Sequence, residues 1–369
     1  MGVPTTTRAA VLTAHGEPLE ITELPLPASV EPGAALVRIT NATLCGTDVE
    51  LWSGKMTFPG MLPMVLGHEM TGEVIATGPG TTDALGREVR PGSRIGWSES
   101  TCGQCHGCRV LREPVTCAER GYGFRQRADR PPYATAGLCE YAYVVPKAAK
   151  LLLPQGFPDS WAAMAGCTAK TVLRAFSRAG GVPPGARVAV LGSGALGLFA
   201  TAVARIVGAG HILVVDTTSH RLELAREFGA DATVLADSEE VPARVRELTS
   251  DAGADLVFDF AGAPAIGAQA VEMAAIRGRV VIVGSTGPDP SALPLGTVMG
   301  KELALFGSLN GDIADYHAAI EFFEAFADRM PWHKLLGTPV GLTGATAHLD
   351  AMRRRAEIKA VIEPHLDRE

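Results

Sequence analysis

The chain has 369 residues, which is long enough for two domains that each bury a hydrophobic core. Hydrophobic residues make up 47% of the sequence, so a disordered protein is excluded. The formal net charge of −7 argues against nucleic acid or an anionic membrane as the main partner. The sequence starts without the apolar stretch of a secretory signal and contains seven cysteines. We therefore expect a cytoplasmic protein whose cysteines bind metal rather than form disulfides.

The first 150 residues or so predict a β-rich region with few helices, because short apolar segments alternate there with glycine- and proline-rich joins. Two of these strands flank a turn at 15–18. The expected strands lie within 9–26, 34–40, 71–78, 93–97 and 139–145.

The pattern changes after residue 153, where strands and helices begin to alternate. Near-continuous apolar strands of this kind are buried on both faces, which indicates an α/β region with a parallel sheet flanked by helices. The run 188–204 is apolar, but its glycine spacing favours a strand, a turn and a helix over a membrane span. The expected strands are 187–192, 211–216, 232–236, 255–260, 279–284 and 303–309.

The segment GSGALG, residues 192–197, closes a predicted strand and opens a predicted helix. This context is typical of a dinucleotide-binding fingerprint. Gly192 permits the tight turn, Gly194 lets the backbone approach a pyrophosphate, and Gly197 lets helix and strand pack closely. The next strand ends in Asp216, whose carboxylate would bind a ribose diol and repel a 2′-phosphate. We therefore favour NAD over NADP. Arg221 lies five residues after Asp216 and is close enough to bind a 2′-phosphate, so NADP remains the alternative.

Four cysteines lie in the short stretch TCGQCHGCRVLREPVTC. Four thiolates close a zinc tetrahedron and leave no position for a substrate, so this spacing predicts a structural metal site. A redox-active C-x-x-C pair and a nucleic-acid-binding zinc ribbon are the alternatives. The cysteines are Cys102, Cys105, Cys108 and Cys117.

Cys45, His68 and Cys167 are dispersed along the chain. Together they supply two thiolates and one imidazole, which is a ligand set of an open, catalytic zinc site. Each residue alone would be unremarkable, because a lone buried cysteine usually acts as a small hydrophobic side chain.

The segments CGTD, GHE, the four-cysteine loop, the late cysteine, GSGALG and Asp216 follow one another in the order typical of one family. Over essentially its whole length, the chain resembles a zinc-dependent alcohol dehydrogenase of the medium-chain dehydrogenase/reductase family. The resemblance implies a GroES-like β-barrel catalytic domain of residues 1–165 and 312–369. It also implies a doubly wound Rossmann NAD-binding domain of residues 166–311, and a homodimer or homotetramer.

The resemblance also implies two zinc ions per chain. Cys45, His68 and Cys167 match the catalytic ligands, and the four-cysteine loop matches the structural ones, although the gap before Cys117 is one residue longer than the commonest spacing. Cys139 matches no ligand position, and we expect it to be a packing residue.

The implied reaction is the oxidation of an alcohol to an aldehyde or ketone, or its reverse. The catalytic zinc would lower the pKa of the alcohol oxygen, and the alkoxide would pass a hydride to NAD⁺. Thr47 matches the first hydroxyl of the family's proton relay. Glu50 stands where many members have a histidine, so either Glu50 is the terminal base or the proton leaves through water.

Further site residues follow from the same resemblance. Asp48 is expected to accept a hydrogen bond from a metal ligand and so to orient it. Glu69 is expected to approach the metal when a ligand exchanges. Trp52 and Trp97 resemble aromatic residues that line the substrate pocket in some members. The expected cofactor site comprises Gly192, Gly194, Ala195, Leu196, Gly197, Asp216, Arg221, Val283 and Lys359, of which Lys359 matches a basic position on the pyrophosphate.

Other functions of the same fold remain as alternatives. A polyol dehydrogenase usually has a carboxylate in place of the late cysteine, and zinc-free enoyl or quinone reductases lack the cysteine–histidine set. A formaldehyde dehydrogenase that acts on a thiol adduct is a further alternative. A crystallin-like or regulatory protein is disfavoured by the intact ligands and fingerprint.

Overall fold

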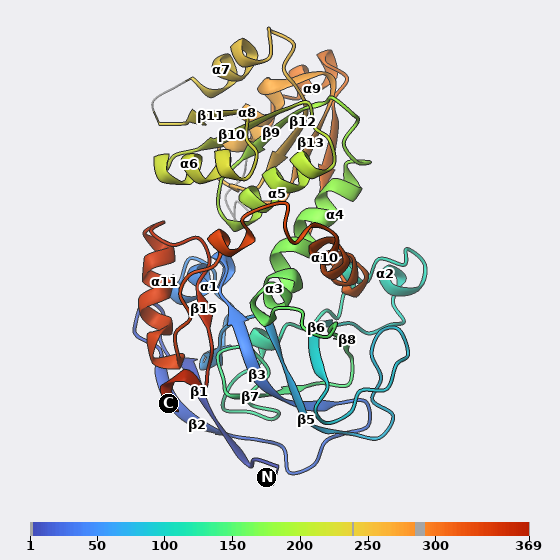
Figure 1. Ribbon diagram of the computed structural model, residues 1–369, viewed down its shortest axis with the longest axis vertical. Helices are drawn as coiled ribbons and strands as arrows, with labels where there is room; N and C mark the ends of the chain where they lie inside the picture. Colours follow the sequence, from blue (N-terminus) through green and yellow to red (C-terminus); the bar gives the residue numbers. More distant parts are fainter. Residues whose placement is uncertain (1–2, 238–239, 285–291, 369) are drawn as a thin grey trace. The chain divides into compact units, whose positions relative to one another are not determined.

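The computed structural model describes residues 3–237, 240–284 and 292–368 (Figure 1). The chain divides into two compact units. The first unit comprises Met1–Cys167, Gly311–Glu324 and Leu336–Glu369, and the second comprises Thr168–Asn310 and Ala325–Leu335. The observed division differs from the expected boundaries in three places: residues 166–167 and residue 311 belong to the first unit, and residues 325–335 to the second.

The first unit consists mainly of strands and short helices. Its elements are β1 (Thr6–Leu12), β2 (Glu20–Pro25), β3 (Ala35–Thr43), α1 (Gly46–Ser53), β4 (Met64–Val65), β5 (Glu69–Thr77), β6 (Arg94–Ser100), α2 (His106–Arg109), η1 (Pro114–Thr116), η2 (Gly123–Arg125), β7 (Tyr141–Val144), β8 (Ala148–Leu152), α3 (Asp159–Met164), the π-helical turn η3 (Ala165–Ala169), α10 (Ile313–Phe326), η5 (Leu342–Gly344), α11 (Ala345–Arg353), β15 (Val361–Ile362) and η6 (Leu366–Arg368).

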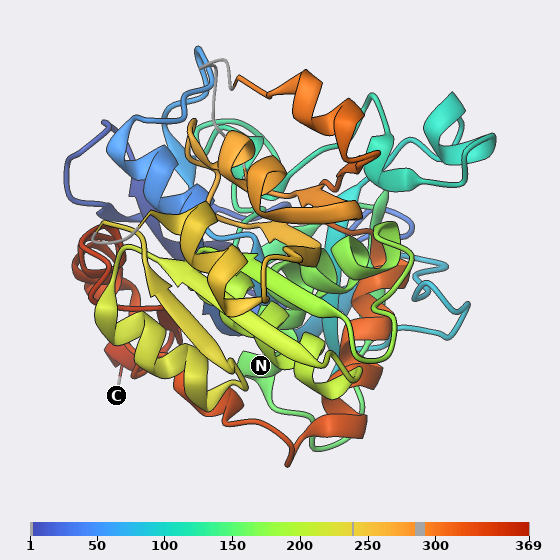
Figure 2. The same ribbon diagram turned by 90° about the horizontal axis from the view of Figure 1, so that it is seen from above.

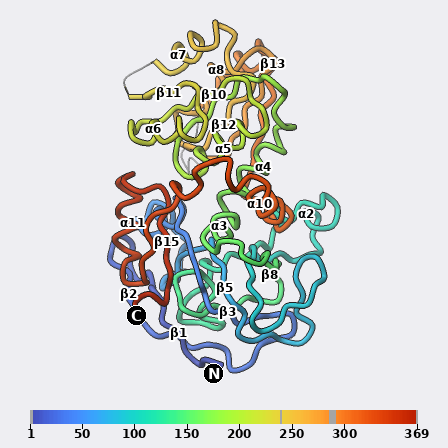
Figure 3. The backbone as a smooth tube through the Cα atoms, in the orientation of Figure 1, coloured from blue at the N-terminus to red at the C-terminus, as the bar shows by residue number. Residues whose placement is uncertain are grey.

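Two antiparallel sheets form the framework of the first unit. One has the strand order β15-β3-β5-β6-β8, with β7 also paired to β3, and the other has the order β2-β1-β4. The C-terminal strand β15 pairs with β3, so that Val361 lies opposite Thr43. Figure 3 follows the C-terminal residues back to these strands. The tail therefore completes a sheet that the N-terminal part of the chain begins.

The second unit alternates strands and helices, apart from α4 at its start. Its elements are α4 (Lys170–Arg178), β9 (Arg187–Leu191), α5 (Ala195–Ile206), β10 (His211–Asp216), α6 (Ser219–Glu227), β11 (Ala232–Leu235), α7 (Val241–Leu248), β12 (Ala254–Asp259), α8 (Ile266–Met273), β13 (Ala274–Ile282), α9 (Leu295–Gly300), β14 (Ala304–Gly307) and η4 (Trp332–Leu335).

The six strands of the second unit form one parallel sheet in the order β11-β10-β9-β12-β13-β14. This is the strand order of a dinucleotide-binding Rossmann fold. Helices α4, α5 and α6 contact one another in series, and so do α7, α8 and α9, which gives a helical layer on each face of the sheet (Figure 2). The prediction of an α/β fold with a doubly wound parallel sheet is confirmed.

The apolar run 188–204 forms β9, the fingerprint turn and most of α5. In the described part of the chain, no helix combines the length and the apolar character that crossing a membrane requires.

Helix α1 was not predicted, and its cap explains why. Cys45 is the N-cap: its sulfur accepts from the backbone N–H of Thr47 over 3.3 Å, and the Asp48 carboxylate accepts from the backbone N–H of Cys45 over 2.9 Å. This is a capping box in which cysteine takes the place of the usual serine or threonine. Among the described residues up to 150, the α-helices are α1 and the four-residue α2, in line with the expectation of few helices there.

Gly192 and Gly197 are both required by the fingerprint turn. Gly192 has a φ of 89°, which a residue with a Cβ adopts only with strain. A methyl group at Gly197 would overlap the carbonyl oxygen of Gly192, whereas one at Gly194 would have only the Arg221 guanidinium within 4 Å, at 3.9 Å.

We therefore expect Gly197→Ala to lower the free energy of unfolding by about 1–3 kcal/mol, because the overlap is with backbone that cannot move aside. This loss outweighs the gain of roughly 1 kcal/mol that alanine brings to a helix interior. Gly194→Ala is the matched control and should unfold at the wild-type temperature. Equal melting temperatures for the two variants, measured by circular dichroism, would contradict this account.

Candidate active site

The structure brings Cys45, His68 and Cys167 together within the first unit. Their ligating atoms and a carboxylate oxygen of Glu69 all lie within 4.8 Å of one another. The Sγ atom of Cys45 is 3.2 Å from Nε2 of His68. Cys45 precedes α1, His68 precedes β5, and Cys167 lies in the middle of η3. Three segments that are far apart in the sequence thus meet at one point.

The imidazole of His68 is held on two sides. Its Nδ1 lies 3.4 Å from Oδ1 of Asp48, while Nε2 points to Cys45. The ring of Phe124 packs against it with 5.3 Å between the ring centroids. A carboxylate behind the non-ligating nitrogen orients a metal-binding histidine and raises its basicity. The orientation of His68 therefore suits metal ligation through Nε2.

Asp48 also joins the two segments that carry Cys45 and His68. It is fully buried, and its carboxylate accepts from the backbone N–H groups of Cys45, at 2.9 Å, and Gly67, at 3.0 Å. The Cys167 thiol donates a hydrogen bond that holds the pKa of Cys45 well below its usual range. A thiolate is the form of cysteine that binds metal.

Glu69 and Lys359 form a fully buried ion pair beside the ligands. Lys359 Nζ lies 2.5 Å from Glu69 Oε2 and also donates to the carbonyl oxygen of Leu44 over 3.3 Å, while the Thr43 hydroxyl donates to the same carboxylate oxygen. The described hydrogen bonds of the Lys359 side chain are thus with Glu69 and Leu44. The role expected for it on a cofactor pyrophosphate stays a prediction.

The four-cysteine loop forms a second cluster, also with its sulfurs within 4.8 Å of one another. Two sulfur pairs, Cys105–Cys108 and Cys102–Cys117, are each 3.6 Å apart. Zn–S bonds of about 2.3 Å in a tetrahedron place two sulfurs about 3.8 Å apart, so the geometry fits a closed zinc site. Backbone N–H groups of Cys108 and Ala118 lower the pKa of Cys105 to about 6, which favours the ligating thiolate.

Cys139 belongs to neither cluster. It is fully buried, its thiol donates to the carbonyl oxygen of Ala136 over 3.1 Å, and burial raises its pKa.

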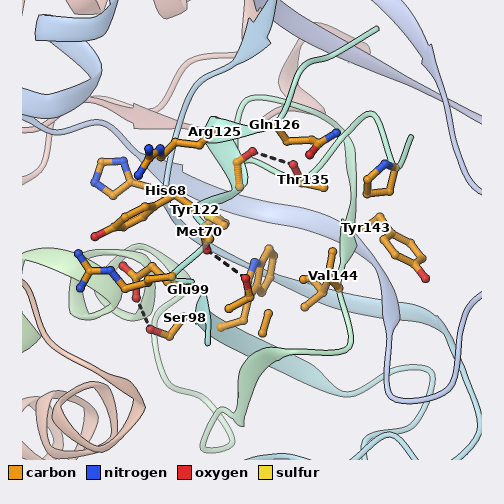
Figure 4. Close-up of a pocket in the computed structure, with 18 of the residues that line it drawn as sticks. His68, Met70, Ser98, Glu99, Tyr122, Arg125, Gln126, Thr135, Tyr143 and Val144 are labelled. Atoms are coloured by element: carbon orange, nitrogen blue, oxygen red, sulfur yellow. Dashed lines mark hydrogen bonds between the residues drawn. The ribbon is translucent and has the colours of Figure 1, made fainter. Parts of the chain in front are cut away.

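A cavity of about 300 Å³ in the first unit opens beside the dispersed ligands. Its lining includes His68 and Gly166, the residue that precedes the ligand Cys167. Figure 4 shows the imidazole of His68 next to Arg125 and Tyr122, with Tyr143 on the other side of the view. The Arg125 guanidinium lies 4.4 Å from the centroid of the Phe58 ring. A substrate in this cavity would meet both aromatic faces and cationic groups.

The two tryptophans expected in the pocket occupy different places. Trp97 lines the cavity. Trp52 is largely buried in the core of the first unit, and its indole N–H donates to the carbonyl oxygen of Glu17 over 2.8 Å. A pocket role for Trp52 stays a prediction.

Arg125 and Tyr122 line the same cavity and were missed from the sequence. They follow the four-cysteine loop in a segment without regular periodicity, and only the folded chain brings them to His68.

Thr47 and Glu50 both lie in α1, the helix that begins after Cys45. Glu50 is half-buried, and burial, together with the negative charge of Cys45, raises the pKa of its carboxyl group. A carboxylate with a raised pKa is a better proton acceptor than an ordinary exposed one. Thr47 and Glu50 thus share the helix whose N-cap is Cys45.

The fingerprint of the second unit is organised around Asp216 at the end of β10. Its carboxylate accepts from the backbone N–H of Ser193, at 2.6 Å, and of Thr218, at 2.9 Å. Ala195 and Leu196 begin α5, and Val283 follows β13, where its N–H donates to the Asp259 carbonyl oxygen over 3.0 Å.

The donor set of each cluster fits zinc. Four sulfurs suit a closed structural site, and two sulfurs with one imidazole leave one tetrahedral position open. Cys45, His68 and Cys167 would hold the second ion, with Asp48 behind His68 and the Glu69–Lys359 pair alongside.

Comparisons with known proteins show the family of the chain. Residues 31–155 match the family model described as "Alcohol dehydrogenase GroES-like domain", and residues 195–325 match the one described as "Zinc-binding dehydrogenase". The chain is 33% identical to a 5-exo-hydroxycamphor dehydrogenase of Pseudomonas putida over 97% of its own length and 99% of that relative. It is 31% identical to an L-threonine 3-dehydrogenase of Edwardsiella ictaluri over 79% of its length and 81% of that relative.

Among solved structures, an alcohol dehydrogenase from Thermotoga maritima superposes with a TM-score of 0.89 at 26% identity, covering 97% of this chain and 99% of that one. The alcohol dehydrogenase TADH from Thermus sp. ATN1 superposes with a TM-score of 0.84 at 29% identity, covering 96% and 99%. The comparisons thus show the family and the fold.

The two clusters predict different effects of removing one sulfur. Cys108→Ser should reduce the zinc content from about two to about one per chain and lower the melting temperature, since a structural zinc contributes directly to folding stability. Cys45→Ser should also reduce the zinc content to about one, but with a melting temperature close to wild type. Elemental analysis with thermal unfolding tests this, and a larger stability loss for Cys45→Ser would contradict it.

Proposed function

The chain belongs to the zinc-dependent alcohol dehydrogenases of the medium-chain dehydrogenase/reductase family, and on that premise we propose that it transfers a hydride between an alcohol and NAD. The observation that carries the proposal is the cluster of Cys45, His68 and Cys167, of which His68 lines a cavity. We propose that this cluster binds a catalytic zinc and that the four-cysteine loop binds a structural one. The product of oxidation is an aldehyde or a ketone.

Zinc in the open site supplies a Lewis acid that lowers the pKa of an alcohol, and NAD⁺ accepts the hydride. The residues of the chain perform the remaining tasks. Cys45, His68 and Cys167 would hold the ion, and Asp48 keeps Nε2 of His68 directed at the site. The cavity beside His68 holds the rest of the substrate and separates it from bulk water.

The alcohol proton must leave the site, and α1 carries the groups for this step. We propose that the Thr47 hydroxyl takes the proton first and that Glu50 accepts it at the end of the relay. The raised pKa of Glu50 supports this assignment, because a terminal base works best when its pKa approaches the working pH.

Asp216 supports the choice of NAD over NADP. Its carboxylate is held at the fingerprint turn by the N–H groups of Ser193 and Thr218. In that position it would accept hydrogen bonds from an adenosine ribose and repel a 2′-phosphate. Arg221 is the group that would favour the phosphate, because its guanidinium lies near Gly194.

The relatives act on chemically different alcohols, so the cavity is the guide to the substrate. One is named for hydroxycamphor, a bulky ring alcohol, and another for threonine, a charged amino acid. The lining of this cavity combines Trp97 and Tyr122 with Arg120 and Arg125. We propose a secondary or aromatic alcohol that also carries a hydrogen-bonding or anionic group.

We also propose that the protein is a cytoplasmic homo-oligomer. All seven cysteines are free thiols, which suits a reducing compartment. Large apolar side chains such as Ile276, Met299 and Leu309 are exposed in the second unit, and such surface is often buried between subunits.

The proposal is tested by following NADH formation from primary, secondary, cyclic, aromatic and carboxylate-bearing alcohols, with NADP⁺ in parallel. We expect activity with NAD⁺ that is lost in Cys45→Ser, and a shift towards NADP⁺ in Asp216→Ser, because that substitution removes the repelling carboxylate. Turnover of no alcohol and no carbonyl compound by the zinc-loaded protein would overturn the proposed function. A wild-type preference for NADP⁺ would overturn the role of Asp216.

The relay makes a separate prediction about pH. Glu50 must be deprotonated to accept a proton, so the rate of alcohol oxidation should fall as the pH falls through its raised pKa. Glu50→Gln should lower kcat by about 100-fold, as loss of a general base does, and should remove this limb of the pH profile. Glu23→Gln, the same change at an exposed site on β2, is the control. An unchanged profile in Glu50→Gln shows that the proton leaves through water.

A further inference from the structure

Tyr316, in the first half of α10, is a buried polar residue to which the proposed reaction assigns no task. Its side chain is fully buried, and its hydroxyl donates to the carbonyl oxygen of Ala162 over 2.8 Å. Ala162 belongs to α3, and Figure 1 shows α10 next to that helix. A buried tyrosine hydroxyl requires a partner, but nothing requires that partner to lie just before a metal ligand.

Two glycines make room for the Tyr316 ring. A methyl group at Gly96, in β6, would overlap the Tyr316 hydroxyl, and one at Gly166 would lie 3.5 Å from the ring. Gly166 is the residue immediately before Cys167. The ring is therefore packed between a strand of the large sheet and the turn that carries the third metal ligand.

This turn, η3, is π-helical and has Cys167 at its centre. A π-helical turn contains one more residue than an α-helical turn, is rarely stable by itself, and occurs mostly at functional sites. The carbonyl oxygen of Ala162 also accepts from the backbone N–H of Ala165, the first residue of η3. The carbonyl that Tyr316 binds therefore lies where α3 passes into the π-helical turn.

We propose that Tyr316 is a positioning residue for the metal centre. Its hydroxyl and ring hold the π-helical turn in register, and this register directs the Cys167 sulfur toward Cys45 and His68. An α-helical register in the same segment would rotate residue 167 by about 100° around the helix axis and carry its sulfur away from the other ligands. The inference rests on the zinc site of the proposed function and adds to it a residue that touches neither metal nor substrate.

The test is the rate at which the full-length, zinc-loaded protein loses metal to a chelator. Tyr316→Phe keeps the ring and removes only the hydroxyl. We expect one of the two zinc ions to be lost about 10- to 100-fold faster than in wild type, as is usual when a group that supports a ligand is removed. The zinc of the four-cysteine loop should be retained and serves as an internal standard.

A second variant perturbs the same contact from the other side. Gly96→Ala should displace the Tyr316 hydroxyl without deleting it, and so should release the same zinc ion. Thr81→Val is the matched control, because it also removes a buried hydroxyl that donates to backbone carbonyl oxygens, those of Ala34 and Gly78, at 2.9 Å each. Its zinc release should equal that of wild type even where its melting temperature falls.

The outcomes separate this inference from the proposed function. Tyr316→Phe with a lowered melting temperature and wild-type zinc release would show a purely structural residue and overturn the inference. Selective zinc release in Tyr316→Phe, in a protein that turns over no alcohol, would support the inference and overturn the proposed function. A wild-type protein holding zinc only in the four-cysteine loop would overturn both.

Discussion

The candidate metal site of the first unit depends on one geometric requirement, which is that Cys45, His68 and Cys167 place their ligating atoms within 4.8 Å of one another. Each ligand reaches this point by a different restraint. Cys45 is fixed as the N-cap of α1, His68 by the Asp48 carboxylate and the Phe124 ring, and Cys167 by the π-helical turn. Since a tetrahedral site tolerates only small displacements of its ligands, these restraints are as much part of the site as the ligands themselves.

The charged side chains beside this cluster are also held in fixed positions. Glu69 and Lys359 are both fully buried and are paired with each other. A buried ion pair contributes little net stability, but removing one partner leaves an uncompensated charge and costs several kcal/mol. The pair also brings the C-terminal tail to the metal ligands, because Lys359 lies two residues before β15, which completes the sheet at β3.

The features that the sequence predicts well are those with a local signature. The parallel strands appear as apolar runs, the fingerprint as three spaced glycines, and the four-cysteine loop as a repeated C-x2-C pattern. Cys45, His68 and Cys167 were joined by the chemistry of their donor atoms and by the family resemblance, because no local pattern links residues that are spread over more than a hundred positions. Helix α1 escaped prediction because a cysteine N-cap is not a recognised signal, although Asp48 three residues later completes the capping box.

The remaining features depend on contacts that no local pattern records. Lys359 matched a cofactor-binding position, yet its contact in the structure is with a carboxylate 290 residues away. Tyr316 has no distinguishing sequence context, and its proposed role follows from Ala162 and Gly166, which precede it by about 150 residues.

The two metal clusters differ in how much of the chain each of them needs, and this difference has a consequence for synthesis on the ribosome. With the proposed assignment, the four-cysteine loop would be able to capture an ion once residue 117 has emerged, whereas the dispersed site would wait for Tyr316 and Lys359, so a nascent chain would hold a structural zinc before a catalytic one.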